Sequence, residues 1–181
     1  MAFYQTNPLY FEHFPPLPSL ESLANDLVEC PPGEELSDKY FLGFWDKERL
    51  VAILDLIDGY PTAEIAYIGL FMVDSRLAGQ GLGSKIIAEL LSQLATHFKK
   101  MRLGYVENNP QSSHFWSKVG FCPTGEVKEL AGKTIHNFVY AKQKTAYFIK
   151  KIRQFFICLT VKKWNFFKGE VYEILECFGT C

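Results

Sequence analysis

The apolar positions near the start of the chain predict one clear helix. Leucines recur at helical spacing between residues 20 and 28, and Ser19, a residue type that caps helix N-termini, stands directly before them. Residues 1–18 are rich in proline and aromatic side chains and end in Phe-Pro-Pro-Leu-Pro, and consecutive prolines cannot be helical. We therefore expect an extended lead-in, then a helix that ends at the Pro-Pro-Gly of residues 31–33.

Three strands are expected next. Residues 39–45, 50–57 and 63–73 are runs of branched and aromatic side chains. The polar residues 46–48 and the Gly-Tyr-Pro of residues 59–61 are turn sequences between them. Such short connections favour an antiparallel meander.

The apolar period then changes. Residues 81–98 carry leucine and isoleucine on one helical face, residues 101–106 read as a strand, and residues 111–119 as a short helix. A strand begins at residues 121–123, and residues 133–142 alternate enough to be another. The order α-βββ-α-β-α-ββ indicates a mixed α/β domain.

Residues 144–181 differ in character from residues 1–143, which we take as the main domain. Lysines and aromatic residues are interleaved, and an amphipathic helix is expected from Tyr147 to Leu159. Its apolar face consists of Phe148, Ile152, Phe155, Phe156 and Leu159. This face predicts packing on the domain or on a second copy, giving a homodimer, while the basic residues allow a helix that lies on an anionic membrane.

Composition narrows the class of protein. The 181 residues are 48% hydrophobic with a net charge of −1, which gives no global indication of a nucleic-acid partner. The N-terminal sequence lacks the features of a signal peptide, and no uncharged apolar run approaches the ~18 residues of a membrane span. The five cysteines and four histidines are scattered, so we expect free thiols, a cytoplasmic protein and no metal.

A glycine-rich loop carries the clearest chemistry. It follows the strand that ends at Val73 and leads into the helix near residue 82. Glycines let a backbone approach a ligand, and a helix start favours phosphate. A dinucleotide fingerprint from Gly79 fails at Ser84, and a P-loop fails because Gly83 is not followed directly by lysine. The alternative is that the glycines only form a tight turn.

Two motifs together resemble the GNAT superfamily of acyl-CoA N-acyltransferases, over about residues 39–142. The family loop, Gln/Arg-x-x-Gly-x-Gly/Ala, aligns with residues 78–83, with alanine in the leading place. The second motif aligns at Asn109, Ser112, Phe115, Gly120 and Phe121, with Trp116 at the family's tyrosine position. The resemblance implies a mostly antiparallel sheet flanked by helices, with a splay between the strands that end at Val73 and Val106.

The resemblance also implies acetyl-CoA as cosubstrate, without a metal. The loop backbone would hold the pyrophosphate, the end of the third strand would pair with the pantetheine arm, and Asn109 would bind that arm or order the next helix. The implied cofactor-binding residues are Phe71, Met72, Val73, Gly79, Gln80, Gly81, Leu82, Gly83, Ser84, Asn109, Ser112, Phe115 and Trp116.

Catalysis by the family implies attack of an amine on the thioester, with a base for the amine and an acid for the thiolate. Trp116 replaces the usual acid, and Tyr105 is the substitute that we expect. Candidate bases are Tyr67, Asp55, Glu64, Glu107 and His114. For Asp55, within an apolar strand, a structural hydrogen bond and recognition of the substrate amine remain equal alternatives.

The acceptor is the least determined part. The family begins with a strand and two helices that wall the acceptor site, whereas here only about 38 residues with one clear helix precede the meander. The acceptor is expected to be a small-molecule or peptide amine. A second class of function, a non-catalytic acyl-CoA-binding or interaction domain, fits the same glycine loop.

Overall fold

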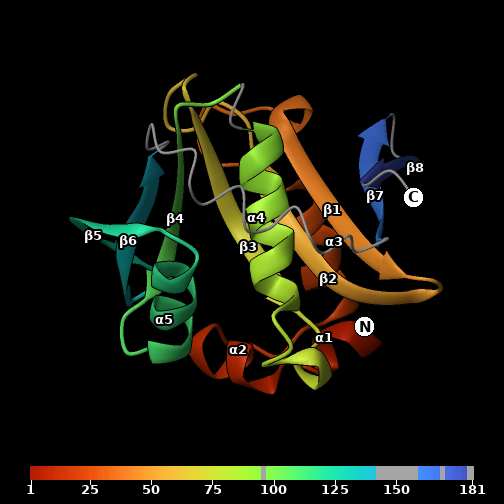
Figure 1. The fold of residues 1–181 in the computed structure, drawn as a ribbon, viewed down its shortest axis with the longest axis horizontal. Coiled ribbons are helices and arrows are strands. Elements are labelled where there is room, and N and C mark those ends of the chain that lie inside the picture. Colours follow the sequence, from red (N-terminus) through yellow and green to blue (C-terminus); the bar gives the residue numbers. More distant parts are fainter. Residues whose placement is uncertain (95–96, 142–158, 168–169, 179–181) are drawn as a thin grey trace.

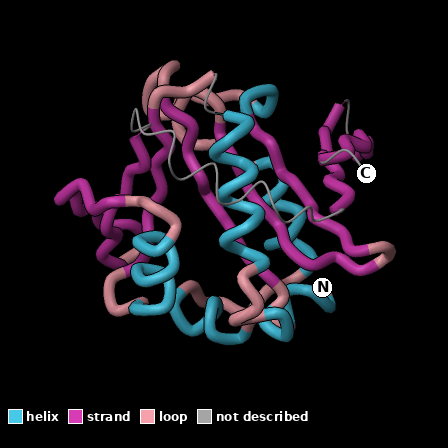
Figure 2. Tube along the Cα trace, in the orientation of Figure 1, coloured by secondary structure: helices cyan, strands magenta, loops and turns pink. Residues whose placement is uncertain are grey.

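A single twisted sheet organises the protein (Figures 1 and 2). The computed structural model describes residues 1–94, 97–141, 159–167 and 170–178. The strands are β1 (Lys39–Asp46), β2 (Arg49–Ile57), β3 (Ile65–Val73), β4 (Lys100–Val106), β5 (Cys122–Leu130), β6 (Lys133–Ala141), β7 (Leu159–Phe167) and β8 (Glu170–Phe178). Their order across the sheet is β5-β6-β4-β3-β2-β1-β7-β8, and within it β3 and β4 pair in parallel while the other neighbours are antiparallel.

Helices cover both faces of this sheet. They are α1 (Ala2–Gln5), α2 (Pro8–His13), α3 (Leu20–Val28), α4 (Leu82–Leu94) and α5 (Pro110–Lys118), with short 3-10 turns η1 (Leu36–Asp38) and η2 (Ser75–Leu77). Figure 1 shows α4 in front of the sheet and α3 behind it, with α1 and α2 at the end where β3 stops and α4 begins. The mixed α/β order expected from the sequence, including the Ser19 cap on α3, is confirmed.

The N-terminal segment differs from the extended lead-in that the sequence predicts. It contains the helices α1 and α2. Pro8 occupies the first turn of α2, where proline lacks only an N–H that would be unpaired in any case. Phe3 and Tyr4 are buried, so burial of aromatic surface offsets the weak helix propensity of these short segments. We call residues 1–18 the N-terminal arm.

The described part of the C-terminal extension is a hairpin. Strand β7 pairs with β1 from Phe41↔Trp164 to Trp45↔Thr160, and β8 pairs with β7. Of the helix expected from Tyr147 to Leu159, only Leu159 lies within the described residues, where it begins β7. The boundary at residue 143 and the association of this tail with a second copy stay predictions.

Two apolar clusters fill the two faces. The larger cluster joins the sheet to α4 and α5 and includes Leu54, Ile87 and Trp116. The smaller cluster joins the sheet to the N-terminal arm and α3, and includes Phe3 and Met72. We call these two sides the α4 face and the arm face. Because side chains alternate along a strand, each strand residue is assigned to one of them.

The larger cluster is expected to dominate stability. Leu54 is 0% exposed, so Leu54→Ala should lower the free energy of unfolding by about 2–5 kcal/mol, because it leaves a cavity. Leu20, on α3, is 76% exposed, and Leu20→Ala should stay within about 0.5 kcal/mol of the parent protein. Urea denaturation followed by circular dichroism measures both, and equal midpoints for the two variants would contradict this assignment of the core.

Candidate functional site

The sheet opens at the ends of its central strands. Strands β3 and β4 pair from Ile65↔Lys100 to Ile68↔Leu103 and then no longer pair. The β2–β3 register shifts at this point, because Asp55 pairs with Leu70 and Leu56 pairs with Ile68, leaving Gly69 as an extra residue. The expected splay is therefore present, and a bulge lies at its start.

The glycine loop lies next to the opening. After η2 the chain passes Gly79 and Gly81, whose φ angles of +76° and +77° favour glycine, and α4 begins at Leu82. A Cβ atom built on either glycine would have no neighbour within 4 Å among the described residues. These two glycines thus form the turn and also leave their backbone open on the side where a side chain would stand. The first turn of α4 directs free N–H groups to the same place.

Gly83 has a different role. A Cβ there would lie 3.2 Å from Cε2 of Phe115 and 3.3 Å from Cγ2 of Val73. This glycine lets α4 approach α5 and the end of β3 closely. Gly83 therefore allows close packing, in addition to its predicted place in the glycine loop.

A buried carboxylate anchors the loop. Asp74 is 0% exposed and accepts hydrogen bonds from Arg49 Nη2 at 2.6 Å and from Arg76 Nη2 at 2.7 Å, Nε at 2.9 Å and backbone N at 3.0 Å. The hydrogen bonds from Arg76, followed by those from Arg49, hold the pKa of this carboxyl well below its usual range despite burial. Two guanidinium groups on one carboxylate leave a net positive charge beside the loop. No local sequence pattern predicts this anchor.

The N-terminal arm touches the same turn. The Ser75 hydroxyl donates a hydrogen bond to the backbone oxygen of Thr6. Thr6 caps the end of α1 and donates its own hydroxyl to the oxygen of Phe3 at 2.8 Å. The arm is thereby joined to the residues that lead into the glycine loop.

The second motif orders α5. The Asn109 side chain accepts a hydrogen bond from Ser112 N at 3.0 Å and caps the helix, which is one of the two roles expected for it. Phe115 stacks on Phe71 with ring centroids 5.8 Å apart. Trp116 is 6% exposed and lies in the core, so it acts in packing rather than as an exposed donor.

Tyr105 lies on β4 beyond the last residue paired with β3. Its ring packs on the α4 face, 5.5 Å from the His136 ring and 4.9 Å from the Phe138 ring. His136 Nε2 is 3.3 Å from Glu107 Oε1. His136 was missed from the sequence, because only the pairing Tyr105↔His136 between β4 and β6 brings it to the site.

Asp55 and Tyr67 lie on the arm face. Lys39 Nζ donates to Asp55 Oδ2 at 2.7 Å, while the buried Oδ1 has no hydrogen-bond partner among the described residues. Burial raises the pKa of the Asp55 carboxyl, and the hydrogen bond and charge of Lys39 partly oppose this rise. A Cβ on Gly69 would meet Asp55 Oδ2 at 2.8 Å, and a Cβ on Gly104 would meet the Tyr67 hydroxyl at 3.2 Å. Two glycines thus make room for these groups at the bulge and the splay.

One candidate base, Glu64, is not brought to the site. Glu64 precedes β3 at the opposite end from the splay and forms an exposed ion pair with Lys99. His114 is exposed on α5. Within the described residues, no three or more His, Cys, Asp or Glu side chains gather as metal ligands would. None of the helices in this part of the chain is long and apolar enough to cross a membrane.

Comparison with known proteins is consistent with this geometry. A model described as the acetyltransferase (GNAT) family matches residues 3–121. An acetyltransferase from Thermus thermophilus superposes with a TM-score of 0.62 at 23% identity, covering 78% of this chain and 87% of that chain. A GNAT family acetyltransferase from Elizabethkingia anophelis with acetyl-CoA bound superposes with a TM-score of 0.52 at 14% identity, covering 69% of this chain and 84% of that chain. A Bacillus subtilis acetyltransferase in complex with CoA superposes with a TM-score of 0.51 at 13% identity, covering 70% of this chain and 95% of that chain. These structures share the fold, and the curated proteins give no match.

The Asp74 anchor predicts a pH-dependent contribution to stability. Because the folded pKa is depressed, this contribution is complete above the unfolded pKa of about 3.9 and is lost as the pH falls toward the lower folded value. Asp74→Asn should lower the free energy of unfolding by about 1–3 kcal/mol at pH 7. The difference in free energy of unfolding between this variant and the parent protein should shrink below about pH 4. Urea titrations at several pH values measure it, with the exposed Asp46→Asn as control; a gap that does not change with pH would rule out the ion pairs as its cause.

Proposed function

Because the chain belongs to the GNAT family of acetyltransferases, we propose that it transfers an acetyl group from acetyl-CoA to a primary amine. The observation that carries this proposal is the glycine loop beside the opening between β3 and β4. A loop alone would support only a phosphate ligand. An opening in the sheet adds a place where a thioester can meet a second substrate from the arm face.

The donor site is formed by the loop and the free edge of β3. Backbone N–H groups from Gly79 to Ser84 bind the pyrophosphate, because no described atom stands over Gly79 and Gly81 and the α4 dipole favours negative charge. Arg49 and Arg76 add positive charge on this side. Residues 71–73 no longer pair with β4, so their backbone is available to the pantetheine arm, as an edge strand is to a peptide.

The reaction is a direct transfer. The neutral amine nitrogen attacks the thioester carbonyl carbon, and a backbone N–H at the β3 bulge stabilises the developing negative charge on oxygen. The carbon–sulfur bond then breaks. One proton leaves the nitrogen and one proton is taken up by the thiolate, so that the products are an amide and a thiol.

The two faces separate the two proton transfers. Tyr105 projects to the α4 face, where the donor lies, and we assign it to the thiolate, with His136 and Glu107 beside it. Trp116 cannot take this role, because it is buried and an indole is not a working acid. Asp55 projects to the arm face and takes up the proton of the amine, and Tyr67 lies on the same face. Burial makes the Asp55 carboxylate a stronger base than a carboxylate in water.

The donor site is tested by binding and by thiol release. Gly81→Asp places a carboxylate over the open backbone and should weaken acetyl-CoA binding at least tenfold in calorimetry. Gly132→Asp is a matched control, because Gly132 also has a positive φ, +72°, with no described neighbour within 4 Å, but lies in the β5–β6 turn. Thiol release from acetyl-CoA with a panel of amines then tests transfer. Tight binding with no release on any amine would favour the non-catalytic alternative.

Tyr105→Phe should separate chemistry from binding. The substitution keeps the ring between His136 and Phe138 and removes the hydroxyl. We expect kcat to fall about 100-fold, a usual size for loss of a general acid, with KM for acetyl-CoA unchanged. Tyr140→Phe, on β6, is the control for removal of a hydroxyl. Equal turnover for Tyr105→Phe and the parent protein would remove Tyr105 from the mechanism.

A further inference from the structure

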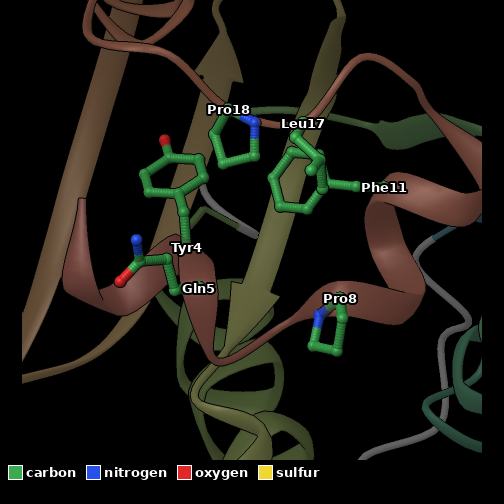
Figure 3. Close-up of a pocket in the computed structure, with 6 residues that line it drawn as sticks. All are labelled: Tyr4, Gln5, Pro8, Phe11, Leu17 and Pro18. Carbon is green, nitrogen blue, oxygen red and sulfur yellow. The ribbon is translucent and has the colours of Figure 1, made fainter.

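The N-terminal arm forms a pocket that sequence analysis did not foresee. Figure 3 shows the rings of Tyr4 and Phe11 on opposite sides of it, Leu17 and Pro18 at one end, and Gln5 and Pro8 at the other. The pocket has a volume of about 240 Å³. Ligand pockets for drug-sized molecules span about 300–1,000 Å³, so this one suits a smaller molecule.

The pocket lies on the arm face at the splayed end of β3. Tyr4 and Phe11 belong to the same apolar cluster as Met72 and Leu70, both in the part of β3 that no longer pairs with β4. The hydrogen bond from Ser75 to Thr6 holds the end of α1 at the turn that follows β3. A molecule in the pocket is therefore next to the opening, on the side opposite α4.

The lining is mostly apolar. Five of the six side chains are aromatic, aliphatic or proline, and Gln5 supplies an amide. Among these six, none is acidic. A ligand that packs on these side chains gains most from an apolar body, because each apolar contact removes apolar surface from water.

Charged groups lie near Tyr4, one wall of the pocket. Burial, followed by the charge of Asp26 on α3, raises the pKa of Tyr4. The same two causes raise the pKa of Tyr10 to about 12, and the charge of Asp55 contributes to both increases. Lys39 is bound to Asp55, with only 3% of its side chain exposed. Tyr4, a wall of the pocket, therefore has two carboxyl groups in its surroundings, and one of them, Asp55, is paired with Lys39.

These observations rest on the proposed function and extend it to the acceptor. We propose that the acyl acceptor is a primary amine with a single apolar body of about the size of a phenyl ring. The body fills the pocket between Tyr4 and Phe11, and the amine points to the opening where acetyl transfer occurs. A polyamine or an amino sugar offers less apolar surface to this lining, so the pocket favours the amine with the apolar body over both.

The test uses full-length protein and four amines: 2-phenylethylamine, spermidine, glucosamine and a short peptide with a free N-terminus. Thiol release from acetyl-CoA should give the highest kcat/KM with 2-phenylethylamine. Leu17→Lys removes one apolar wall and adds a cation at the mouth, so it should lower this kcat/KM about tenfold or more through KM, leaving KM for acetyl-CoA unchanged. Leu17 is 74% exposed, and the equally exposed Leu20→Lys on α3 is the matched control.

Binding is measured separately, by saturation-transfer NMR of 2-phenylethylamine with CoA present. Binding that Leu17→Lys abolishes and Leu20→Lys retains supports the pocket even if no amine is acetylated, in which case the proposed transfer alone fails. The pocket assignment is overturned if 2-phenylethylamine does not bind, if both variants behave alike, or if spermidine, glucosamine or the peptide is the better substrate.

Discussion

The parting of β3 from β4 is the constraint on which the rest of the site depends. Parallel strands usually continue side by side as long as both are extended, and here the register shift between Asp55 and Leu56 bends β3 away after Ile68. Gly69 permits this bend, because its missing Cβ leaves space for the Asp55 carboxylate. Without the bulge the sheet would be closed, and the glycine loop and the N-terminal arm would lie on two sides of a continuous barrier.

The site is thus divided between the two faces of one sheet. The α4 face holds the open glycines, the guanidinium groups on Asp74 and the Tyr105 ring, which together suit an anionic donor. The arm face holds the pocket between Tyr4 and Phe11, which in our proposal receives the apolar body of the amine. In the proposed reaction the positive charge of Arg49 and Arg76 favours the anionic donor on the α4 face and disfavours a cationic amine there.

The sequence predicted those parts whose signals are local. Apolar periodicity identified α3, α4 and the central strands, and the spacing of Gly79, Gly81 and Gly83 identified the loop. The missed parts depend on contacts between distant residues. Arg49 reaches Asp74 only when β2 lies beside the end of β3, and His136 joins Tyr105 only through the β4–β6 register. Helices α1 and α2 have four and six residues, too few for an apolar period to be visible, and tertiary packing overrides the proline signal.

The C-terminal hairpin has a consequence for how the sheet is completed. Phe41 pairs with Trp164, which lies 123 positions later in the chain. Contacts between residues so far apart require closure of a long loop and form slowly. During synthesis, the hydrogen-bonding edge of β1 stays open until residues 159–167 have left the ribosome. An open edge is a template for strands of other chains, so until β7 pairs with β1 the nascent protein exposes the edge of its central strands to such pairing, and afterwards β8 is the outer strand on that side.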